Sequence, residues 1–467
     1  MDWVTCTQAP ACTGLAYRPS GLCLYHQSPA QRAEILRTFA PGRLVDLRGT
    51  TLDDDLLTQV LAATGSRPGR TRLDRARFTA DARFGGVSFL GDVSLDGARF
   101  DRLASFFGAR FEGNVSLAGA VFARELSFHG VGVRGHASLD RAVLARDALF
   151  SQAAFGRGLS CERARFDGYT VFDDARLGET TSFRGARFGR TLSFRKVSGG
   201  AGFDTAHFAG NAYLSMTGRL SASRVRADAG LDVCVTGSGA DFRRAEIAGR
   251  LLLKLADSQA DLEGAVLHGP ASVTGRGQAA LHSLRDVRAP ELSLAGLDLS
   301  CCRFAGFAHP SGLRLKDCTF GLTPRGVRVG LHWPPLRWFT RRRWLADEHG
   351  LHEHAPDGGP QSAAGQADAE RLAALYAELH RCMDDRNTAS DFAFGAMEMR
   401  RMATRRWWLS LSWLLWGYGL RMGRTVVWFT LLAAIAMGAV FVATASHATR
   451  RSSPPPAPRP PESVQFR

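Results

Sequence analysis

Lysine is almost missing from this basic sequence. The 467 residues include 59 lysines and arginines against 44 aspartates and glutamates, a formal net charge of +15, yet the only lysines are Lys196, Lys254 and Lys316. So strong a preference for arginine indicates genome composition rather than a mechanism. The arginines are also unevenly spread, because they concentrate in residues 325–343 and 400–406. The sequence therefore predicts local basic patches rather than a uniformly basic surface.

Cysteine is scarce and follows no framework. The nine cysteines are an odd number without the regular spacing of paired disulfides. Residues 1–30 also lack the basic start and apolar run of a secretory signal. Because disulfides form in oxidising compartments, we expect the bulk of the chain to lie in a reducing cytoplasm.

Sequence motifs for catalysis are missing as well. There is no P-loop, no dinucleotide fingerprint after a strand, no Gly-x-Ser-x-Gly and no His-Glu-x-x-His. His129, His136 and His207 occur singly, and Asp173-Asp174 lies among arginines, which favours a surface row of salt bridges. We therefore expect no enzyme, no catalytic residues and no cofactor-binding residues.

What the sequence has in abundance is a repeat of eleven residues. Two ladders of apolar residues, offset by six positions, run through the first half of the chain. The first ladder is Phe78, Phe89, Phe100, Phe111, Phe122, Val133, Leu144, Phe155, Phe166, Leu177 and Phe188; the second is Phe84, Leu95, Phe106, Leu117, Phe128, Leu139, Phe150, Cys161, Phe172, Phe183 and Phe194. So regular a pattern identifies an internal repeat.

An eleven-residue period also suits a long helix with a right-handed supercoil. However, a second small or apolar residue, such as Ala76 or Val87, lies two positions before each ladder residue. On a helix these positions would point around the whole circumference, whereas on a strand residues i and i−2 share one face. The 50 glycines, many in turn-like steps such as Asp96-Gly97, weaken a helix further. Short strands are therefore predicted.

We predict an all-β solenoid in which each segment of five or six residues forms one short strand and a corner. Copies of a segment stack one coil later, so that phenylalanine lies over phenylalanine at the strand spacing of about 4.8 Å. With four segments to a coil, one coil takes about 22 residues. Residues 73–320 then form roughly eleven coils in a rod about 50 Å long.

The repeat also carries a family resemblance. Triplets such as Ala76-Arg77-Phe78 and Ala164-Arg165-Phe166 resemble the small-x-(Leu/Phe) core of pentapeptide-repeat proteins, here of a bacterial, membrane-associated kind. The resemblance covers about half the chain and implies a right-handed parallel β-helix. The sequence departs from the family pattern in two ways. Arginine or serine mostly replaces the usual aspartate or asparagine between the inward residues, and segments alternate five and six residues, so each extra residue should form a bulge at a corner.

The first 30 residues form a separate cysteine and histidine module. Cys6, Cys12, Cys23 and His26 supply four ligands with the spacing Cys-x5-Cys-x10-Cys-x2-His. A closed set of four such ligands predicts structural zinc rather than catalytic zinc; the alternative is an N-terminal tail of free thiols. Similar small Cys/His modules precede the repeats of bacterial proteins of the family it resembles.

The segments on either side of the repeat have other roles. Residues 31–72 are predicted to be an N-terminal cap, because an open terminal coil would expose unpaired backbone and apolar rings. Residues 321–366 are predicted to be a linker. Its histidines, His349, His352 and His354, lie among glycines, prolines and acids, which favours a solvated segment over a metal site.

The C-terminal part is predicted to be helical and to meet a membrane. Residues 367–424 are expected to be helical, and the Trp- and Leu-rich stretch 407–420 suits a lipid headgroup region. Residues 425–446 carry no charge and are long enough to cross a bilayer, so we expect a transmembrane helix rather than a buried soluble one. Arginines are more numerous before this segment than after it, which predicts a single-pass protein of the cell membrane with a cytoplasmic solenoid. Residues 447–467 are expected to be a disordered, Pro-rich tail.

These features predict a non-enzymatic, membrane-tethered scaffold that binds an unknown protein partner and contacts anionic lipid headgroups. Two alternatives remain. A basic nucleic-acid binder or topoisomerase modulator would use the arginines, although the topoisomerase-protecting members of the family that the sequence resembles need a strongly acidic face. A membrane-associated enzyme would need a cleft with titrating groups.

Overall fold

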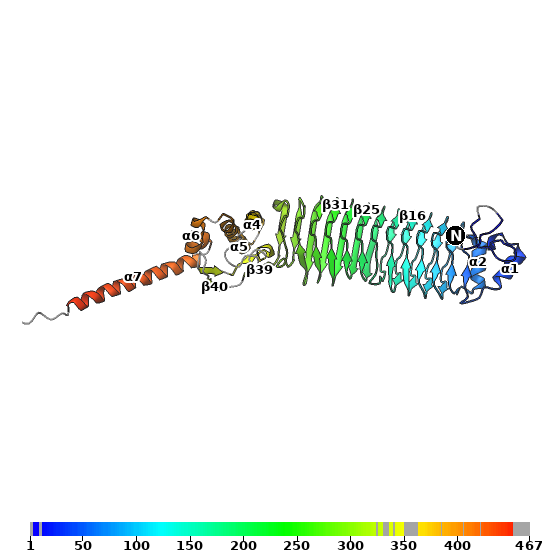
Figure 1. Ribbon diagram of the computed structural model, residues 1–467, viewed down its shortest axis with the longest axis horizontal. Coiled ribbons are helices and arrows are strands. Elements are labelled where there is room, and N and C mark those ends of the chain that lie inside the picture. The colour runs from blue at the N-terminus through cyan, green and yellow to red at the C-terminus, as the bar shows by residue number, and fades with distance from the viewer. Residues whose placement is uncertain are drawn as a thin grey trace, which may run out of the picture.

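The chain forms a long rod with a helical region at one end. The computed structural model describes residues 3–8, 12–323, 326–329, 336–339, 341–349, 363–383, 385–404, 406–420 and 422–451. Figure 1 shows the N-terminal module at one end of the rod, a stack of parallel strands along its length, and the C-terminal helices beyond the other end. The predicted all-β solenoid is confirmed, with about twelve coils, since its most continuous sheet has 12 strands.

The first half of the solenoid has four faces, each formed by one short strand per coil. Parallel pairing joins Arg77 to Arg99, which lies two sequence repeats further on, so the predicted coil length is confirmed. The strands of the first two faces are as follows. Face 1 holds β1 (Val45–Asp46), β3 (Thr71–Arg72), β7 (Val93–Ser94), β11 (Val115–Ser116), β15 (His136–Ser138) and β19 (Gly158–Ser160). Face 2 holds β2 (Thr51–Leu52), β4 (Arg77–Phe78), β8 (Arg99–Phe100), β12 (Val121–Phe122), β16 (Val143–Leu144), β20 (Arg165–Phe166), β22 (Arg187–Phe188), β25 (His207–Phe208), β28 (Arg226–Ala227), β31 (Glu246–Ile247) and β34 (Val266–Leu267).

The other two faces complete each coil. Face 3 holds β5 (Ala82–Arg83), β9 (Ala104–Ser105), β13 (Leu126–Ser127), β17 (Ala148–Leu149), β21 (Thr170–Val171), β23 (Leu192–Ser198), β26 (Ala212–Thr217), β29 (Leu231–Thr236), β32 (Leu251–Ala256), β35 (Ala271–Arg276), β37 (Leu292–Ala295) and β38 (Leu313–Lys316). Face 4 holds β6 (Ser88–Phe89), β10 (Arg110–Phe111), β14 (Gly132–Val133) and β18 (Ala154–Phe155).

The two ladders fill the interior of this stack. Every ladder residue is buried, and many of the rings one coil apart lie face to face. The ring centroids of Phe78 and Phe100 are 4.5 Å apart, and those of Phe89 and Phe111 are 4.7 Å apart. The predicted stacking of phenylalanine over phenylalanine is therefore confirmed, and the residues two positions earlier, such as Ala76, are buried beside the rings.

A corner with a left-handed backbone lies in each five-residue step of the ladders, for example at Gly86 between Phe84 and Phe89. Positive φ angles recur at every eleventh position, and at Arg75 the Ala76 N–H donates to the Leu73 carbonyl 3.0 Å away. A positive φ at the third residue of a hydrogen-bonded turn is the signature of a type II turn. The residues at this position are Arg75, Gly86, Gly97, Gly108, Gly119, Gly130, Arg141, Gln152, Arg163, Asp174, Gly185 and Lys196. These regular tight turns lie in the five-residue steps and not in the six-residue steps, for which the bulges are predicted.

After residue 190 the solenoid changes from four faces to three. The strand β23 runs through the positions of faces 3 and 4, with a register shift between Phe194 and Val197. Later coils are shorter than two sequence repeats, because Ala212 already pairs with Leu231. Face 3 becomes a broad sheet of longer strands, and face 1 continues in a separate sheet. That sheet contains β24 (Ala201–Gly202), β27 (Leu220–Ser221), β30 (Gly239–Asp241), β33 (Gln259–Asp261) and β36 (Ala280–Ser283).

Serine and acidic side chains form ladders on the outside of the coils. Ser193 Oγ donates to the Asp173 carboxylate at 2.7 Å, and the same carboxylate accepts from the Arg195 backbone N–H at 3.0 Å. Asp173 therefore joins a hydrogen-bonded ladder rather than the row of salt bridges that we expected for Asp173-Asp174. Arginine–aspartate pairs do occur on face 2, where both Arg77 and Arg99 contact Asp101.

Helices pack against the first coil, and parallel pairing begins earlier than residue 73. β1 and β2 already pair with β3 and β4. The helix α2 (Asp54–Ala63) begins after Asp53, whose carboxylate accepts from the Leu56 N–H at 2.9 Å. Its apolar side chains, such as Leu56, join the core of the solenoid. The helix α1 (Pro29–Leu36) precedes it, with a capping box formed by Ser28 and Gln31.

The C-terminal region is helical, as predicted, and packs on the last coils. Two small antiparallel pairs come first: β39 (Gly321–Leu322) with β42 (Arg343–Trp344), and β40 (Gly326–Val329) with β41 (Leu336–Phe339). The helices that follow are α4 (Ala363–Arg381), α5 (Arg386–Thr404), α6 (Trp407–Trp416) and α7 (Met422–Arg451). The Asp347 carboxylate accepts from the Phe304 N–H at 2.7 Å, which ties the segment to the solenoid.

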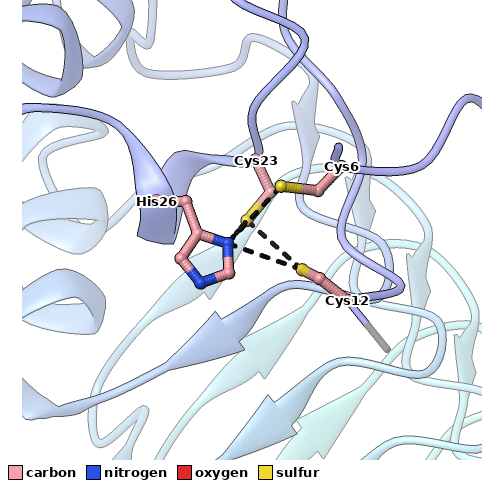
Figure 2. A group of neighbouring side chains, drawn as sticks. All are labelled: Cys6, Cys12, Cys23 and His26. Atoms are coloured by element: carbon pink, nitrogen blue, oxygen red, sulfur yellow. Dashed lines mark hydrogen bonds between the residues drawn. The ribbon is translucent and has the colours of Figure 1, made fainter. Parts of the chain in front are cut away.

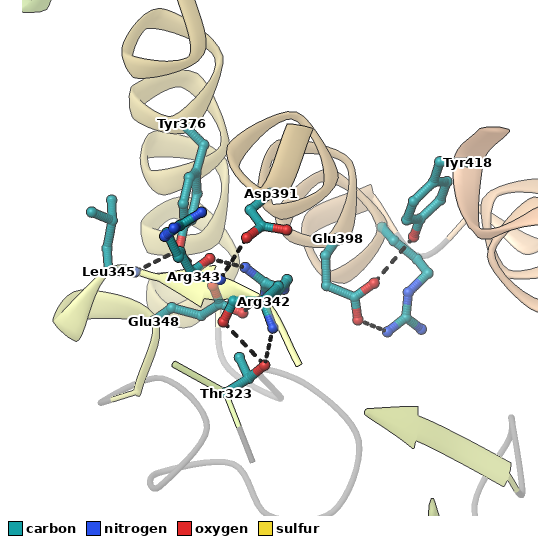
Figure 3. A network of polar contacts seen from close by, with 10 residues as sticks. Thr323, Arg342, Arg343, Leu345, Glu348, Tyr376, Asp391, Glu398 and Tyr418 are labelled. Atoms are coloured by element: carbon teal, nitrogen blue, oxygen red, sulfur yellow. Dashed lines mark hydrogen bonds and ion pairs between the residues drawn. The ribbon is translucent and has the colours of Figure 1, made fainter. Parts of the chain in front are cut away.

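Two arginines of the predicted basic patches, Arg342 and Arg401, lie inside this region. Arg342 is 5% exposed and pairs with Glu348, and the Tyr376 hydroxyl donates to Glu348 at 2.6 Å (Figure 3). Arg401 pairs with Glu398 and lies over the Trp413 ring at 5.1 Å. Arg342 and Arg401 are therefore internal ion-pair partners rather than surface contacts for nucleic acid or lipid.

The expected transmembrane helix finds no support in the fold. A helix, α7, does form over residues 425–446. Among the residues that the structure describes, however, no helix combines the length and apolar character needed to cross a bilayer. Residues 447–451 of the predicted disordered tail belong to the end of α7 instead. Residues 452–467 lie outside the described residues, as do His352 and His354.

Candidate metal centre

Three short stretches of the N-terminal module bring the predicted metal ligands together. Cys6 follows a β-bridge between Thr5 and Leu15. Cys23 and His26 belong to one turn, because Cys23 is the N-cap of the 3₁₀-helix η1 (Leu24–His26). The Cys-x2-His spacing therefore places a thiol and an imidazole on the same side of this turn, where Cys12 joins them (Figure 2).

The four ligand atoms have the separations of a tetrahedral metal site. All lie within 4.8 Å of one another. The His26 Nδ1 atom is 3.4 Å from Cys6 Sγ, 3.6 Å from Cys12 Sγ and 3.4 Å from Cys23 Sγ, and the sulfurs of Cys12 and Cys23 are 3.8 Å apart. Zn–S and Zn–N bonds of about 2.3 and 2.0 Å at tetrahedral angles require edges of about 3.8 Å for two sulfurs and 3.5 Å for sulfur and nitrogen. The three distances from His26 and the distance between Cys12 and Cys23 match these edges, so the cluster has the ligands and spacing to hold a metal ion.

Close packing fixes the geometry of these ligands. A Cβ atom on Gly14 would lie 2.6 Å from the Cys23 Cβ, so only glycine fits beside this thiol. The Gln27 amide donates to the Leu22 carbonyl at 2.9 Å, which braces the turn from the other side. Leu24, between the two ligands of η1, is fully buried in the core. The ligand set is thus held by the fold around it.

The local electrostatics distinguish two of the thiols. Burial, followed by repulsion from Cys12 and Cys6, raises the pKa of Cys23 to about 12. Burial also opposes ionisation of Cys6, but hydrogen bonds from Cys23, Gln8 and His26 outweigh it and lower the Cys6 pKa to about 7. A divalent metal ion bound among these thiols would favour their deprotonated form, including that of Cys23.

The module is fastened to the first coil by backbone and side-chain hydrogen bonds. The Leu15 N–H donates to the Arg48 carbonyl at 2.8 Å, and the Tyr17 hydroxyl donates to the Asp46 carbonyl at 2.8 Å. Burial raises the pKa of Tyr17 above its usual range, so the phenol remains a donor. The metal cluster therefore adds to the cap at this end of the solenoid.

All four predicted ligands come together, and the other histidine patch does not. Cys6, Cys12, Cys23 and His26 form the only group of potential metal ligands found among the described residues. His349 packs edge-on against Trp344, with ring centroids 5.2 Å apart. His129 and His136 remain isolated from acids and thiols in the described contacts, and His207 contacts Asp228 at 2.7 Å.

One buried polar group in the C-terminal region was not predicted from the sequence. The buried group of Arg342, Glu348 and Tyr376 joins two segments that are far apart in the sequence, and the Leu345 N–H also donates to the Tyr376 hydroxyl at 2.8 Å. Burial and then the Glu348 charge raise the pKa of Tyr376 well above its usual range. No motif marks these residues, since each belongs to an ordinary polar stretch.

Comparison with known proteins identifies the repeat. A family model of pentapeptide repeats (9 copies) matches residues 84–132. No curated protein matches the chain. The matched residues contribute strands to all four faces of the solenoid, where Phe84, Phe89, Phe100 and Phe106 are stacked ladder residues. The match and the parallel β-solenoid together support a pentapeptide-repeat protein.

Proposed function

We propose that this protein is a non-enzymatic scaffold whose solenoid binds a partner protein at the surface of a membrane. The observation that carries the proposal is the filled core. Stacked side chains occupy the interior of the coils, which leaves the flat outer faces as the surfaces open to a partner. A rigid rod of this kind presents side chains at fixed spacing and loses little conformational entropy on binding.

The broad part of face 3, from β23 to β38, is the surface best suited to a protein partner. Its outward side chains include Tyr213, 36% exposed, and Leu252, which together line a shallow hollow of about 220 Å³ with Lys254. All three lysines of the chain lie on these strands, Lys196 on β23, Lys254 on β32 and Lys316 on β38. Apolar contacts surrounded by cations favour a protein with an acidic, partly apolar surface.

The C-terminal helices are proposed to contact the membrane. Large apolar side chains of α7 are exposed, including Phe429 at 67%, Leu432 at 59% and Ile435 at 60%. So many exposed apolar side chains on one helix favour burial against lipid or another protein. The surplus of arginines before α7 favours a cytoplasmic position for the solenoid and anionic lipid headgroups as its neighbours.

Zinc is proposed as the metal of the Cys6, Cys12, Cys23 and His26 cluster. Three thiolates and one imidazole are soft and borderline ligands that suit this ion, and the closed set leaves no position for a substrate. The proposed role is structural, since the metal would hold the module as part of the cap.

The three lysines provide a direct test of the proposed partner surface. An amine-reactive crosslinker in intact cells can react with the chain only at these lysines and at its N-terminal amine. We expect a discrete crosslinked species with the unmodified chain. The variant with Lys196, Lys254 and Lys316 all changed to Arg keeps the charge but removes the reactive amines, so this species should disappear.

A second variant separates binding from reactivity. Leu252→Glu places a like charge against the acidic partner while leaving every lysine in place, so the crosslinked species should fall at least about fivefold. Ser127→Glu, on face 3 of the first half, is the matched control and should have no effect. The scaffold proposal is wrong if no crosslinked species forms, or if both glutamate variants behave alike.

Membrane association has its own test. The full chain should sediment with the membrane fraction of disrupted cells, and the triple change of Phe429, Leu432 and Ile435 to Asn should move most of it to the soluble fraction. Changing Leu90, an exposed apolar residue of the solenoid, to Asn should leave the distribution unchanged. Recovery of the unmodified chain in the soluble fraction contradicts the membrane part of the proposal.

A further inference from the structure

An arginine-lined hollow lies where the N-terminal module meets the first coils. It has a volume of about 550 Å³, and Arg48, Arg70, Arg72 and Arg75 line it together with Trp3. This volume is within the range of small-molecule sites. Asp74 and Asp92 are the acidic residues of its lining, so the guanidinium groups outnumber the carboxylates two to one.

The carboxylates of the hollow are engaged with neighbours other than these arginines. Asp74 accepts a hydrogen bond from Ser94 Oγ. Asp92 accepts from the Asn114 N–H at 2.8 Å. Within the described part of the chain, no ion pair forms to Arg70, Arg72 or Arg75, whereas Arg77 and Arg99 on face 2 both contact Asp101. Neighbouring cations repel one another, and an anion bound among them would relieve that repulsion.

The space itself results from one large residue in a column of small ones. Parallel register on face 1 aligns Arg72 with Ser94, and Ser94 with Ser116. Arg72 is thus followed on the next two coils by the small side chains of Ser94 and Ser116. These leave room on the outer face for a ligand roughly 10 Å long, about two strand spacings. The arginines then lie at one end of this space and the serines at the other.

The serine end offers hydrogen-bond acceptors. The Ser94 hydroxyl proton is directed to Asp74, and the Ser116 hydroxyl proton is directed to Asp96. A hydroxyl has two acceptor lone pairs besides its proton. The oxygens of Ser94 and Ser116 therefore remain available to accept hydrogen bonds from hydroxyl groups of a ligand.

Trp3 connects the hollow to the metal centre. Its indole N–H donates to the Thr13 carbonyl at 2.8 Å, next to Cys12. The Arg48 guanidinium lies 5.0 Å from the Trp3 ring centroid, and Arg48 pairs with Asp46 at 2.8 Å. The fold of the cysteine module thus places Trp3 and Arg48 at the wall of the hollow.

We propose that this hollow binds a phosphate monoester of a hydroxylated compound, such as a sugar phosphate. A guanidinium matches two phosphate oxygens with paired hydrogen bonds, so the phosphate lies among Arg70, Arg72 and Arg75. The hydroxyl groups of the ligand extend over Ser94 and Ser116. The same chemistry is present in a free sugar phosphate and in the headgroup of a phosphorylated inositol lipid. This site is separate from the partner surface on face 3.

Calorimetric titration of the full chain in detergent tests the proposal, with ribose 5-phosphate as the probe. Ribose 5-phosphate should bind, ribose should not, and inorganic phosphate should bind more weakly because it lacks the hydroxyl groups. The double variant Arg72→Gln with Arg75→Gln should weaken binding at least about tenfold, since it removes charge-assisted hydrogen bonds to the phosphate. Arg110→Gln on face 4 is the matched control and should bind as the unmodified chain does.

Two further measurements define the ligand and its link to the metal module. Vesicles containing phosphatidylinositol 4-phosphate show whether the ligand is a lipid headgroup or a free sugar phosphate. Competition with ribose 5-phosphate indicates the lipid headgroup, and no competition indicates the free compound. Cys12→Ser should weaken ribose 5-phosphate binding because it releases Trp3. The proposal is overturned if ribose 5-phosphate does not bind at 10 mM, or if the double variant binds as well as Arg110→Gln. Binding of duplex DNA with no binding of ribose 5-phosphate overturns it too.

Discussion

The rings of Phe78 and Phe100 lie parallel, with an angle of 2° between their planes and 4.5 Å between their centroids. The same relationship continues to Phe122, whose ring is 4.7 Å from Phe100. The Phe100 ring is therefore packed above and below by its copies from the two neighbouring coils. This distance is close to the spacing of parallel strands, so backbone hydrogen bonding and ring packing require the same repeat.

Removal of one ring should strongly destabilise the stack. Phe100→Ala leaves a cavity between Phe78 and Phe122, and we expect a loss of about 3–5 kcal/mol in the free energy of unfolding. Urea denaturation followed by circular dichroism measures this loss. Phe107→Ala is the control, because Phe107 is 59% exposed at a corner and its loss should cost less than about 1 kcal/mol. Equal effects of the two variants would contradict a core built from ladder residues.

Backbone conformation at the corners gives a second prediction. Gly119 has a φ angle of 65°, and a Cβ added there would meet no atom within 4 Å. Gly119→Ala should therefore destabilise by about 1 kcal/mol through the left-handed backbone alone. Gly132, on β14, also has open space around an added Cβ but has no positive φ angle. Gly132→Ala should stabilise by about 0.5–1 kcal/mol. Denaturation midpoints that move in the same direction would contradict this explanation.

The sequence predicted the first half of the fold because one physical rule governs it. Each inward position must be apolar and each corner must allow its backbone angle, so the period is visible in the residues themselves. The change to three faces could not be predicted in this way. It depends on the strand β23, which continues past the corner position Lys196 with a register shift. The period of eleven is still intact at this point, so it does not distinguish a continuing strand from another corner. The later, shorter coils, in which Ala212 pairs with Leu231 and Leu231 with Leu251, also lose the strict period of eleven.

The candidate metal centre was predictable for a related reason. Soft ligands are rare enough that four of them within about 20 residues indicate a site, and Cys23 and His26 lie close enough in sequence to share one turn. The arginine hollow was not predictable, because it requires Trp3 to lie over the coil that carries Arg72. The internal position of two arginines of the predicted basic patches was not predictable either. Arg342 and Arg401 have acidic partners that only the packing of the C-terminal helices brings near.

Metal binding can be measured on the full chain. Native mass spectrometry should find one zinc ion per chain, and Cys12→Ser should weaken zinc binding by a factor of about 100 or more, since one of four ligands is lost. Chelation should make residues 3–26 sensitive to protease while the solenoid stays protected. The free energy of zinc binding stabilises the fold of the cysteine module, whereas the solenoid does not depend on it. Cys301→Ser, a change of an exposed cysteine, should have no effect. A zinc content that is the same in both serine variants would rule out this ligand set.

The buried pair of Arg342 and Glu348 gives the last prediction. Glu348 is 1% exposed and Arg342 is 5% exposed. Burial disfavours the charge of Arg342, but the adjacent Glu348 outweighs burial and raises the Arg342 pKa, so the guanidinium stays charged. Glu348→Gln leaves this cation buried without its counter-charge and should destabilise the helical region by about 3–5 kcal/mol.

Hydrogen exchange can localise this effect. Amide protons of α4 and α5 should exchange much faster in Glu348→Gln, while those of the solenoid should keep their protection, because its ladder rings pack on one another within the coils. Asp368→Asn is the matched control, since it breaks a pair with Arg371 in which the side chains are 56% and 81% exposed. Exposed ion pairs contribute little to stability, so the free energy of the opening that permits exchange should change by less than about 1 kcal/mol. Faster exchange along the whole solenoid would mean instead that the helical region and the coils unfold as one unit.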